Sequence, residues 1–399
     1  MLPVEVALER VLALAGDRLP SEAVPVAEAL GRALAAPVTA QRTLPPWDNS
    51  AMDGYAVRAE EAVDGARLRV AMTIHAGDRP ERALERGEAA RIMTGAPMPP
   101  GADAVVMQER TTLPEPGLVQ LSEAARPGLN VRQRGEDVAE GAPLLPAGRA
   151  LGISEAAALW AQGLSSVTVS RRPTVAIASS GDELCDVLEA PNGRVVDTNT
   201  PVLAQLCRTA GALPTVLGRA PDRLDAMTGL FSKGLSFDVL LAVAGASVGE
   251  KDYTREALAA VGVEMDFWKV AMKPGKPLAV GRRGGTLVFG LPGNPVSAMV
   301  TFELFVRPAL RQLQGLAPAP TLLPGRLATP ITKAAGLRHF VRATVARRGD
   351  GLWATPLSSQ SSGALASAAG ATHLISIAPD ATEVAEGAVV ELIPLSWGT

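Results

Sequence analysis

Cysteine and histidine are scarce in this sequence of 399 residues, which has two of the former and three of the latter. The two cysteines, Cys185 and Cys207, can form neither a disulfide framework nor a zinc site with four thiolate ligands. The three histidines, His75, His339 and His373, are so widely separated that a histidine-based metal site or a Ser-His-Asp triad would require distant segments to converge. We therefore expect neither kind of site.

Long apolar runs and an excess of charge of one sign are also missing. No run of 18 apolar residues is present, so no membrane-spanning helix is expected. The N-terminal stretch carries Glu5, Glu9 and Arg10 and does not have the uninterrupted apolar segment of a secretory signal, which favours a cytoplasmic protein. Lys plus Arg is 38 and Asp plus Glu is 41, for a net charge of -3. We expect neither nucleic acid nor a membrane as a partner.

Hydrophobic residues make up 47% of the chain, and 39 glycines and 32 prolines punctuate it. At about 150 residues per domain, this length predicts two to four domains. We place a discontinuous N-terminal linker domain at 1–48 and 138–172, with helices over Val4–Ala15, Val26–Ala35 and Ser154–Gln162. Ser154 is the predicted N-cap of the third helix.

Residues 49–137 are expected to form a β-rich domain, because short apolar segments alternate there with glycine and proline clusters. Residues 173–315 alternate strands with helices, which is typical of a doubly wound parallel sheet. A long helix is predicted from Asn294 to about Leu313. Residues 316–399 alternate short β segments with turns, which predicts a small β-barrel or sandwich. The fold class is therefore a multidomain α/β protein.

Two loops of the β-rich domain are dense in turn formers and polar side chains. The first spans residues 45–56 and includes Asp53, and the second spans 91–101 and includes Thr94. A hydroxyl and exposed backbone N–H groups near a glycine can hold an anion. By themselves these loops are explained equally well as turns.

The loops that follow the predicted parallel strands combine glycine, serine and acidic residues. Ser180, Gly181 and Glu183 follow the first strand, and Asp222 follows the second. The loop after the third strand contains three further candidates, Ser247, Gly249 and Asp252. Ligands bind at the carboxyl ends of such strands, and carboxylates together with substrate phosphates suit Mg²⁺. The alternative is that these are ordinary capping loops.

Basic residues and a helix N-terminus complete the predicted site. Lys273 and Lys276 lie three apart in a loop made stiff by proline, with Lys269 just upstream and Pro277 just downstream. Cations in this pattern indicate an oxyanion site, whereas solvated lysines are the usual alternative. The segment with Pro292 and Ser297 ends a strand and opens a helix, whose free amides favour an anion. No Walker lysine motif and no dinucleotide-binding glycine motif is present.

Eight motifs in one order closely resemble the MoeA family of molybdopterin molybdenumtransferases. They are PPWDNSAMDGYAV, RIMTGAPMPPGADAVV, RGEDV, SSGDEL, VDTN, GASVGEKDY, MKPGKP and LPGNPVS. The resemblance spans nearly the whole chain. It implies insertion of molybdate into adenylylated molybdopterin with release of AMP, a requirement for Mg²⁺, and a homodimer of four-domain subunits whose active site is shared between subunits.

The resemblance also implies roles for individual residues. The catalytic residues would be Asp53, Asp137, Asp252, Lys273 and Lys276, and the metal ligands would be Glu183, Asp222 and Asp252. The substrate-binding residues would be Thr94, Ser180, Gly181, Ser247, Gly249, Lys269, Pro277, Pro292, Ser297, Arg338 and Ser362. The family also has a molybdate-contacting pair of one arginine and one serine. Here the arginine is Arg338 or Arg342, and the serine is Ser361 or Ser362.

One position departs from the family pattern, because Ala244 stands where the family has the first of two adjacent glycines. If that position required a positive φ, the loop would shift and phosphate binding would weaken. Three other functions are alternatives to the transferase: a non-catalytic molybdopterin carrier or scaffold, the adenylylating enzyme of the same pathway, and an unrelated Mg²⁺-dependent nucleotide hydrolase. The retained acidic and basic residues favour the transferase. The sequence leaves open whether molybdate or tungstate is preferred.

Overall fold

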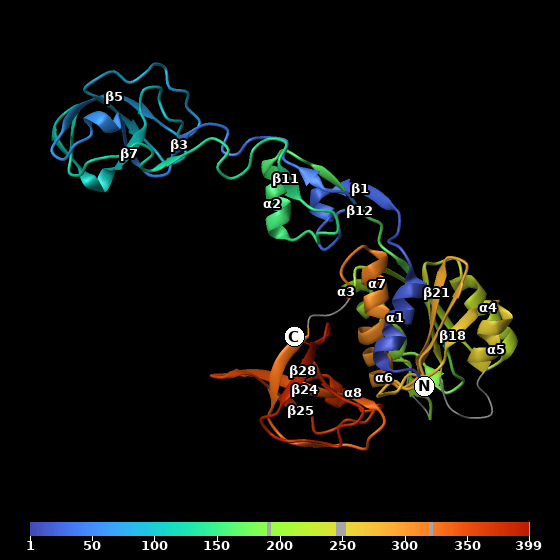
Figure 1. Ribbon diagram of the computed structural model, residues 1–399. Coiled ribbons are helices and arrows are strands. Elements are labelled where there is room, and N and C mark those ends of the chain that lie inside the picture. Colours follow the sequence, from blue (N-terminus) through green and yellow to red (C-terminus); the bar gives the residue numbers. More distant parts are fainter. Residues whose placement is uncertain (190–192, 245–252, 319–321, 399) are drawn as a thin grey trace. The chain divides into compact units, whose positions relative to one another are not determined.

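The computed structural model describes residues 1–189, 193–244, 253–318 and 322–398 (Figure 1). The chain forms two compact units. Unit 1 consists of Met1–Ala35, Gly148–Gly152 and Ser166–Thr399, and unit 2 consists of Ala36–Ala147 and Ile153–Ser165. The boundaries of the four domains expected from the sequence stay a prediction. None of the helices in the described part of the chain has the length and apolar character that a membrane span requires.

A six-stranded sheet forms the centre of unit 1, in the order β16-β13-β17-β21-β20-β18. Four neighbouring strands are parallel, whereas β20 and β18 extend the sheet with antiparallel pairing that the sequence did not predict. The strands are β13 (Thr174–Ser180), β16 (Leu213–Ala220), β17 (Val239–Ala244), β18 (Glu264–Phe267), β20 (Ala279–Arg283) and β21 (Thr286–Pro292).

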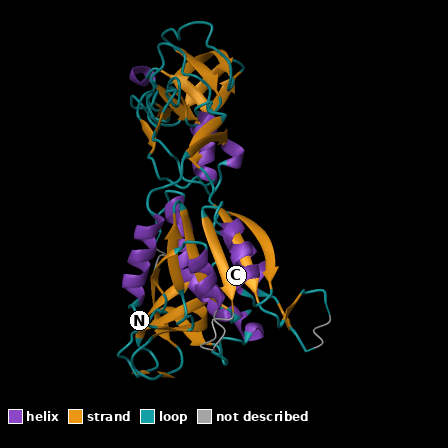
Figure 2. Ribbon diagram, turned by 90° about the vertical axis from the view of Figure 1, so that its right-hand side faces the viewer, coloured by secondary structure: helices purple, strands orange, loops and turns teal. Residues whose placement is uncertain are grey.

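Helices cover both faces of this sheet, as the predicted doubly wound fold requires (Figure 2). Successive side chains of a strand point to opposite faces of the sheet, so that Val175 and Ile177 pack into one apolar cluster and Ala176 and Ala178 into the other. One face carries α1 (Val4–Ala15), α3 (Asn199–Thr209) and the continuous helical segment α6 (Pro295–Thr301), η4 (Phe302–Val306) and α7 (Arg307–Leu313). The other carries α4 (Leu224–Gly234) and α5 (Tyr253–Ala260).

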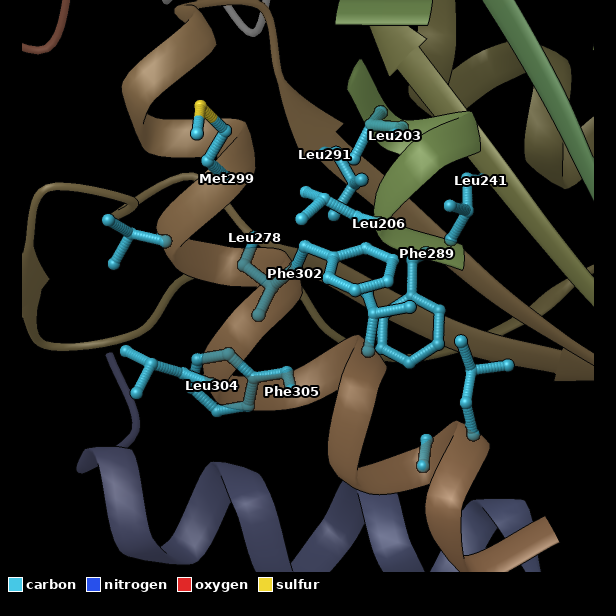
Figure 3. Packing of buried hydrophobic residues seen from close by; sticks show 14 of the residues in the cluster. Leu203, Leu206, Leu241, Leu278, Phe289, Leu291, Met299, Phe302, Leu304 and Phe305 are labelled. Carbon is cyan, nitrogen blue, oxygen red and sulfur yellow. The ribbon is translucent and has the colours of Figure 1, made fainter. Parts of the chain in front are cut away.

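The long helix predicted from Asn294 is confirmed, with Asn294 as its N-cap and Pro295 in its first turn. Its middle turn, η4, is a π-helix in which all five residues are buried. Phe302 of this turn and Phe289 of β21 lie close together beside Leu206 of α3 (Figure 3). This contact packs β21 of the sheet against α3 and against the helical segment that begins with α6.

The C-terminal region of unit 1 is a closed five-stranded β-barrel, as expected from its alternating pattern. The barrel closes because β24 pairs with both β25 and β26. Its strands are β22 (Leu323–Leu327), β24 (Arg338–Arg348), β25 (Gly351–Pro356), β26 (His373–Ile377) and β28 (Val389–Pro394). A short strand from the central domain, β19 (Met272–Lys273), adds to β24 in parallel. The helix α8 (Leu365–Ala368) and the pair β23 (Ile331–Thr332) and β27 (Glu383–Val384) lie in the same region.

Unit 2 contains the β-rich part that the sequence predicts. Its sheet has the order β7-β4-β6-β5-β9-β8, with β4 (Gly54–Val57), β5 (Arg67–Ile74), β6 (Glu88–Ile92), β7 (Ala104–Met107), β8 (Thr111–Glu115) and β9 (Leu118–Leu121). Smaller elements are the pairs β3 (Asn49–Ser50) with β10 (Val131–Arg132) and β2 (Val38–Thr39) with β11 (Pro143–Leu145), the 3-10 turns η2 (Ala59–Glu61) and η3 (Gln108–Arg110), and α2 (Ile153–Ala161).

Two local predictions are wrong. The helix expected over Val26–Ala35 is only one 3-10 turn, η1 (Val26–Glu28), because Gly31 takes a φ of +77° and Leu34 pairs with Val169 in an isolated bridge. This bridge extends the antiparallel pair of β1 (Ser21–Pro25) and β12 (Ser166–Ser170). Helix α2 begins at Ile153, so Ser154 lies inside its first turn rather than at the N-cap.

We expect Phe302→Ala to lower the free energy of unfolding of unit 1 by about 3–5 kcal/mol, because the deletion leaves a cavity in a fully buried cluster. Phe302→Leu keeps most of the volume and is expected to lose less. Urea denaturation of the full chain, followed by tryptophan fluorescence, measures both. A stability of Phe302→Ala within 1 kcal/mol of the unsubstituted protein would contradict the assigned packing.

Candidate active site

A cavity of about 980 Å³ opens at the carboxyl ends of the parallel strands, the position where doubly wound sheets bind ligands. Ser180 ends β13, Val243 lies next to the end of β17, and Pro292 ends β21. The described residues that line the cavity belong to unit 1. Eight of the residues singled out from the sequence are among them: Ser180, Glu183, Lys273, Lys276, Pro277, Pro292, Ser297 and Ser362.

The other predicted residues of unit 1 lie outside the lining. Gly181 and Asp222 belong to the loops behind Glu183, and the Lys269 carbonyl accepts a hydrogen bond from the N–H of Leu2. Arg338 also lies outside it. Ser247, Gly249 and Asp252 lie outside the described residues.

The loop after β13 requires its glycine. Gly181 has a φ of +150°, and a Cβ atom there would lie 2.8 Å from Glu183 Oε2. The backbone then continues as β14 (Leu184–Cys185), which pairs in parallel with β15 (Val195–Val196). The glycine therefore lets the Glu183 carboxylate fold back against the end of the strand.

The acidic loops after β13 and β16 bind each other. The Asp182 N–H donates to Asp222 Oδ2 at 3.4 Å, and the Asp222 N–H donates to Asp182 Oδ1 at 3.3 Å. The structure therefore brings Asp222 to the loop of Glu183. Within the described ranges, no group of three His, Cys, Asp or Glu side chains is close enough to hold a metal ion.

The loop that carries Lys273 and Lys276, which we call the lysine loop, is held in place by backbone hydrogen bonds from residues before and after it. The N–H groups of Val270 and Leu278 both donate to the Lys276 carbonyl at 3.1 Å. Gly275 has a φ of +98°, and a Cβ atom there would lie 2.6 Å from Thr301 Cγ2. Lys273 pairs with His339 of the barrel. The two lysines are thus presented to the cavity by a fixed loop, as the sequence predicted.

Positive charge affects the neighbouring imidazole. The pKa of His339 is lowered from its usual 6.5 to about 4, mainly by burial and additionally by the positive charges of Lys273, Lys333 and Arg342. His339 is therefore neutral near pH 7 and adds no charge to the lysines.

The start of α6 meets a loop from the barrel. The Val296 N–H donates to the Ser362 carbonyl at 3.2 Å, and Asn294 Nδ2 donates to Ser362 Oγ at 3.1 Å. Both Ser361 and Ser362 line the cavity. The N-terminus of α6 and the barrel loop thus form one wall of the cavity, and Ser297 in the first turns of α6 belongs to the same wall.

The two competing arginines have different positions. Arg338 forms a salt bridge with Glu5 at 2.6 Å and donates to Ser376 Oγ at 3.0 Å. Arg342 is buried, and one of its Nη atoms donates to the carbonyls of Ser359 at 2.7 Å and Ser361 at 3.2 Å. Arg342 therefore holds the backbone of the loop that contains Ser359, Ser361 and Ser362, which we call the serine loop.

Asp197 also lines the cavity, although it is not among the predicted site residues. Its carboxylate accepts hydrogen bonds from Ser179 Oγ at 3.1 Å and Thr200 Oγ1 at 2.7 Å. Asn199 donates to the Gly293 carbonyl at 2.6 Å, which ties the start of α3 to the β21 loop. The position of Asp197 just before a helix was the available signal, since such residues commonly cap helices.

Asp53 and Thr94 come together in unit 2. The Asp53 carboxylate accepts from the Thr94 N–H at 2.7 Å and from Thr94 Oγ1 at 2.8 Å. These two bonds, in that order, lower the pKa of Asp53, and the nearby Arg91 adds a smaller effect. The Asp137 N–H donates to the Leu44 carbonyl at 3.1 Å, and no side-chain bond joins Asp137 to Asp53 within the described residues.

Ala244 is the last residue of β17, where it pairs in parallel with Pro292 of β21. The backbone of a strand has a negative φ, which alanine adopts as readily as other residues. The departure from the family glycine therefore creates no backbone strain at this position.

Taken together, the fold and the cavity define a multidomain α/β protein with a crevice, lined by lysine, serine and carboxylate side chains, at the strand ends of a doubly wound sheet. Three family models match in order: the MoeA N-terminal region (domains I and II) over residues 2–163, a probable molybdopterin-binding domain over 176–312, and the MoeA C-terminal region (domain IV) over 324–395. The chain belongs to the MoeA family.

Curated relatives and solved structures are similar to this chain over most of its length. The molybdopterin molybdenumtransferase of Haemophilus influenzae is 38% identical over 79% of this chain and 78% of its own length. Molybdopterin molybdenumtransferase 2 of Mycobacterium tuberculosis is 36% identical over 94% of this chain and 95% of its own. A crystal structure of the molybdopterin biosynthesis MoeA protein from Pyrococcus horikoshii has a TM-score of 0.86 at 28% identity, covering 99% of this chain and 100% of that one.

We expect stability to fall as the pH decreases from 6.5 to 4, because the unfolded chain binds a proton at His339 that the folded chain does not. In His339→Gln this contribution is absent, so its melting temperature should fall less over the same range. His75→Gln, at an exposed histidine, is the control and should follow the unsubstituted protein. Parallel curves for all three proteins would contradict the assignment.

We expect Thr94→Val to raise the pKa of Asp53, because it removes the hydroxyl bond. The backbone bond remains, so the pKa should stay below the usual 3.8. Thr94→Ser keeps a hydroxyl and is the matched control. Carboxyl carbon NMR measures the titration, and an equal pKa in the valine and serine variants would show that the hydroxyl bond has no effect.

Proposed function

We propose that this protein is a molybdopterin molybdenumtransferase, which inserts molybdate into adenylylated molybdopterin and releases AMP. The observation that carries the proposal is the single cavity that combines Lys273, Lys276, Glu183 and Ser297 at the end of a doubly wound sheet. Curated relatives that are 30–42% identical over most of the chain bear this name.

The substrates and the cavity have complementary charges. Molybdate is a dianion and the adenylylated pterin carries a pyrophosphate, so both require cations and hydrogen-bond donors. Lys273 and Lys276 supply fixed positive charge, and the hydroxyls of Ser297 and Ser362 supply donors. The volume of about 980 Å³ is at the upper end of the range for small-molecule sites, as two substrates require.

The reaction needs no covalent protein intermediate. A molybdate oxygen, or a water molecule that loses a proton to solvent, attacks the phosphorus on the pterin side of the phosphoanhydride, the bond to AMP breaks, and AMP leaves with the bonding electron pair. The two thiols of the pterin then bind molybdenum, and one molybdate oxygen leaves as water with their two protons. Lys273 and Lys276 stabilise the negative charge that develops on the oxygens, and their loop holds them there before the reaction starts. Asp197, oriented by Ser179 and Thr200, is an acceptor for hydroxyl or amine groups of the substrate.

The proposal includes Mg²⁺. Glu183 and Asp222 belong to two loops that contact each other, and Mg²⁺ requires only one or two carboxylates in addition to substrate phosphates and water. When bound, the ion would neutralise phosphate charge and polarise the phosphoanhydride. Asp252 completes the predicted ligand set but lies outside the described residues.

The homodimer is also part of the proposal. Asp53 and Asp137 are the family's remaining acidic residues, and they belong to unit 2. In the proposed dimer, Asp53 and Asp137 of one subunit would complete the site of the other. The bond from Thr94 keeps Asp53 ionised for this role.

The test is AMP release from adenylylated molybdopterin and Mg²⁺, with and without molybdate. We expect molybdate-dependent release by the unsubstituted protein and a loss of about 10²–10³-fold in Lys276→Gln, because one stabilising charge is removed. Glu183→Gln should also lose activity, whereas Glu264→Gln, at an exposed glutamate of β18, is the matched control and should retain it.

Other outcomes identify the alternatives. Release of AMP that does not depend on molybdate would indicate a nucleotide hydrolase. Tight binding of the pterin without release would indicate a carrier or scaffold. Either result would overturn the proposed reaction.

A further inference from the structure

A second cavity of unit 1 is lined by five arginines, and none of the described residues that line it carries a carboxylate. Its volume is about 250 Å³, and we call it the arginine cavity. Its lining residues are Leu30, Gly31, Arg32, Arg172, Arg208, Thr209, Ala210, Gly211, Arg307, Arg311, Gln314 and Leu316. It shares no residue with the candidate active site.

The arginine cavity lies at the far ends of the helices that line the active site. Asn199 at the start of α3 lines the active site, and Arg208 in the last turn of α3 lines the arginine cavity. The segment from α6 to α7 repeats this arrangement with Ser297 and Arg311. The 11 residues of α3 alone separate the two sites by about 16 Å.

Two of the five guanidinium groups have carboxylate partners. Arg32 pairs with Glu22, and Arg307 pairs with the buried Glu303 at 3.2 Å. Arg307 also donates to Thr209 Oγ1 at 2.9 Å. These bonds fix the two side chains and neutralise their charge.

The other three arginines have no carboxylate partner within the described residues. Arg311 Nε donates to the Ala317 carbonyl at 2.7 Å, which positions its guanidinium, while Arg172 and Arg208 form no side-chain bond to a carboxylate. Burial and the like charge of Arg307 lower the pKa of Arg311, as expected where positive charges are crowded. Glu28 lines a neighbouring cavity with Arg172 and pairs with none of these arginines.

Helix ends do not balance this charge. The C-termini of α3 and α7 lie at the arginine cavity, and each carries a partial charge of roughly -0.5. Together they offset about one of the three unpaired guanidinium charges. A surplus of about two positive charges remains, which matches a dianion.

We propose that the arginine cavity binds a compact dianion with a tetrahedral oxyanion group, either as a free oxyanion or as a phosphate monoester. Guanidinium forks bind such oxygens in pairs. The cavity has room for roughly eight water molecules, which suits a small ligand of this kind. Arg208 is exposed and Arg311 is half-buried, so that the ligand can enter from solvent.

The test is isothermal titration calorimetry of the full chain with three probes, inorganic sulfate, inorganic phosphate and glycerol 3-phosphate, at constant ionic strength in chloride. We expect saturable binding that weakens about tenfold or more in Arg208→Gln and again in Arg311→Gln. Tighter binding of glycerol 3-phosphate than of phosphate would identify a monoester ligand, and equal binding would identify a free oxyanion.

Two control variants separate this site from others. Arg347→Gln removes an exposed arginine of the barrel, and Lys276→Gln alters the active site only. Both should retain binding to the arginine cavity. Saturable binding that is unchanged in Arg208→Gln and Arg311→Gln, or no saturable binding at all, would overturn the proposal.

A partner surface is the remaining outcome. If these arginines contact carboxylates of a second copy, Arg208→Glu should change the sedimentation coefficient while sulfate fails to bind the unsubstituted protein. That result would also overturn the proposed anion site. Neither the calorimetry nor the sedimentation experiment depends on molybdenum transfer, so that a failure of the proposed anion site is distinguishable from a failure of the proposed function.

Discussion

The parallel pairing of β19 with β24 is the constraint on which the candidate active site depends. Two residues of the central domain, Met272 and Lys273, join the barrel strand at Arg338 and His339. Together with the bonds from the start of α6 to Ser362, this join links the loop of Lys273 and Lys276 to the barrel loop of Ser361 and Ser362. The barrel is thus a wall of the cavity as well as a domain, and its closure around β24 makes that wall rigid.

Holding like charges close together has consequences for the neighbouring groups. Lys273 and Lys276 face the same cavity, and the fold offsets their repulsion with Glu183 and Asp197 in the same lining. His339 stays neutral beside them because it is buried. The energy that holds the lysines together comes from backbone hydrogen bonds and apolar packing formed during folding, so substrate binding does not have to supply it.

Local patterns predicted local structure well, and long-range pairing poorly. The helices and parallel strands of unit 1 followed from apolar periodicity, and the motif order led to the family. The helix expected over Val26–Ala35 failed because Leu34 pairs with Val169, more than a hundred residues away. The choice between Arg338 and Arg342 depends on which one faces the serine loop, and the importance of Asp197 depends on Ser179. No spacing in the sequence contains that information.

The chain leaves and re-enters unit 1 twice, since unit 2 consists of Ala36–Ala147 and Ile153–Ser165. This arrangement sets an order for folding during synthesis. Unit 2 is complete once Ser165 has left the ribosome, whereas the sheet of unit 1 lacks β21 until Pro292 has been made. At ordinary translation rates the interval lasts several seconds or more. During it, α1 lacks the elements it packs against, because β20, η4 and α7 follow late in the chain, whereas β1 can pair with β12 as soon as Ser170 has been made.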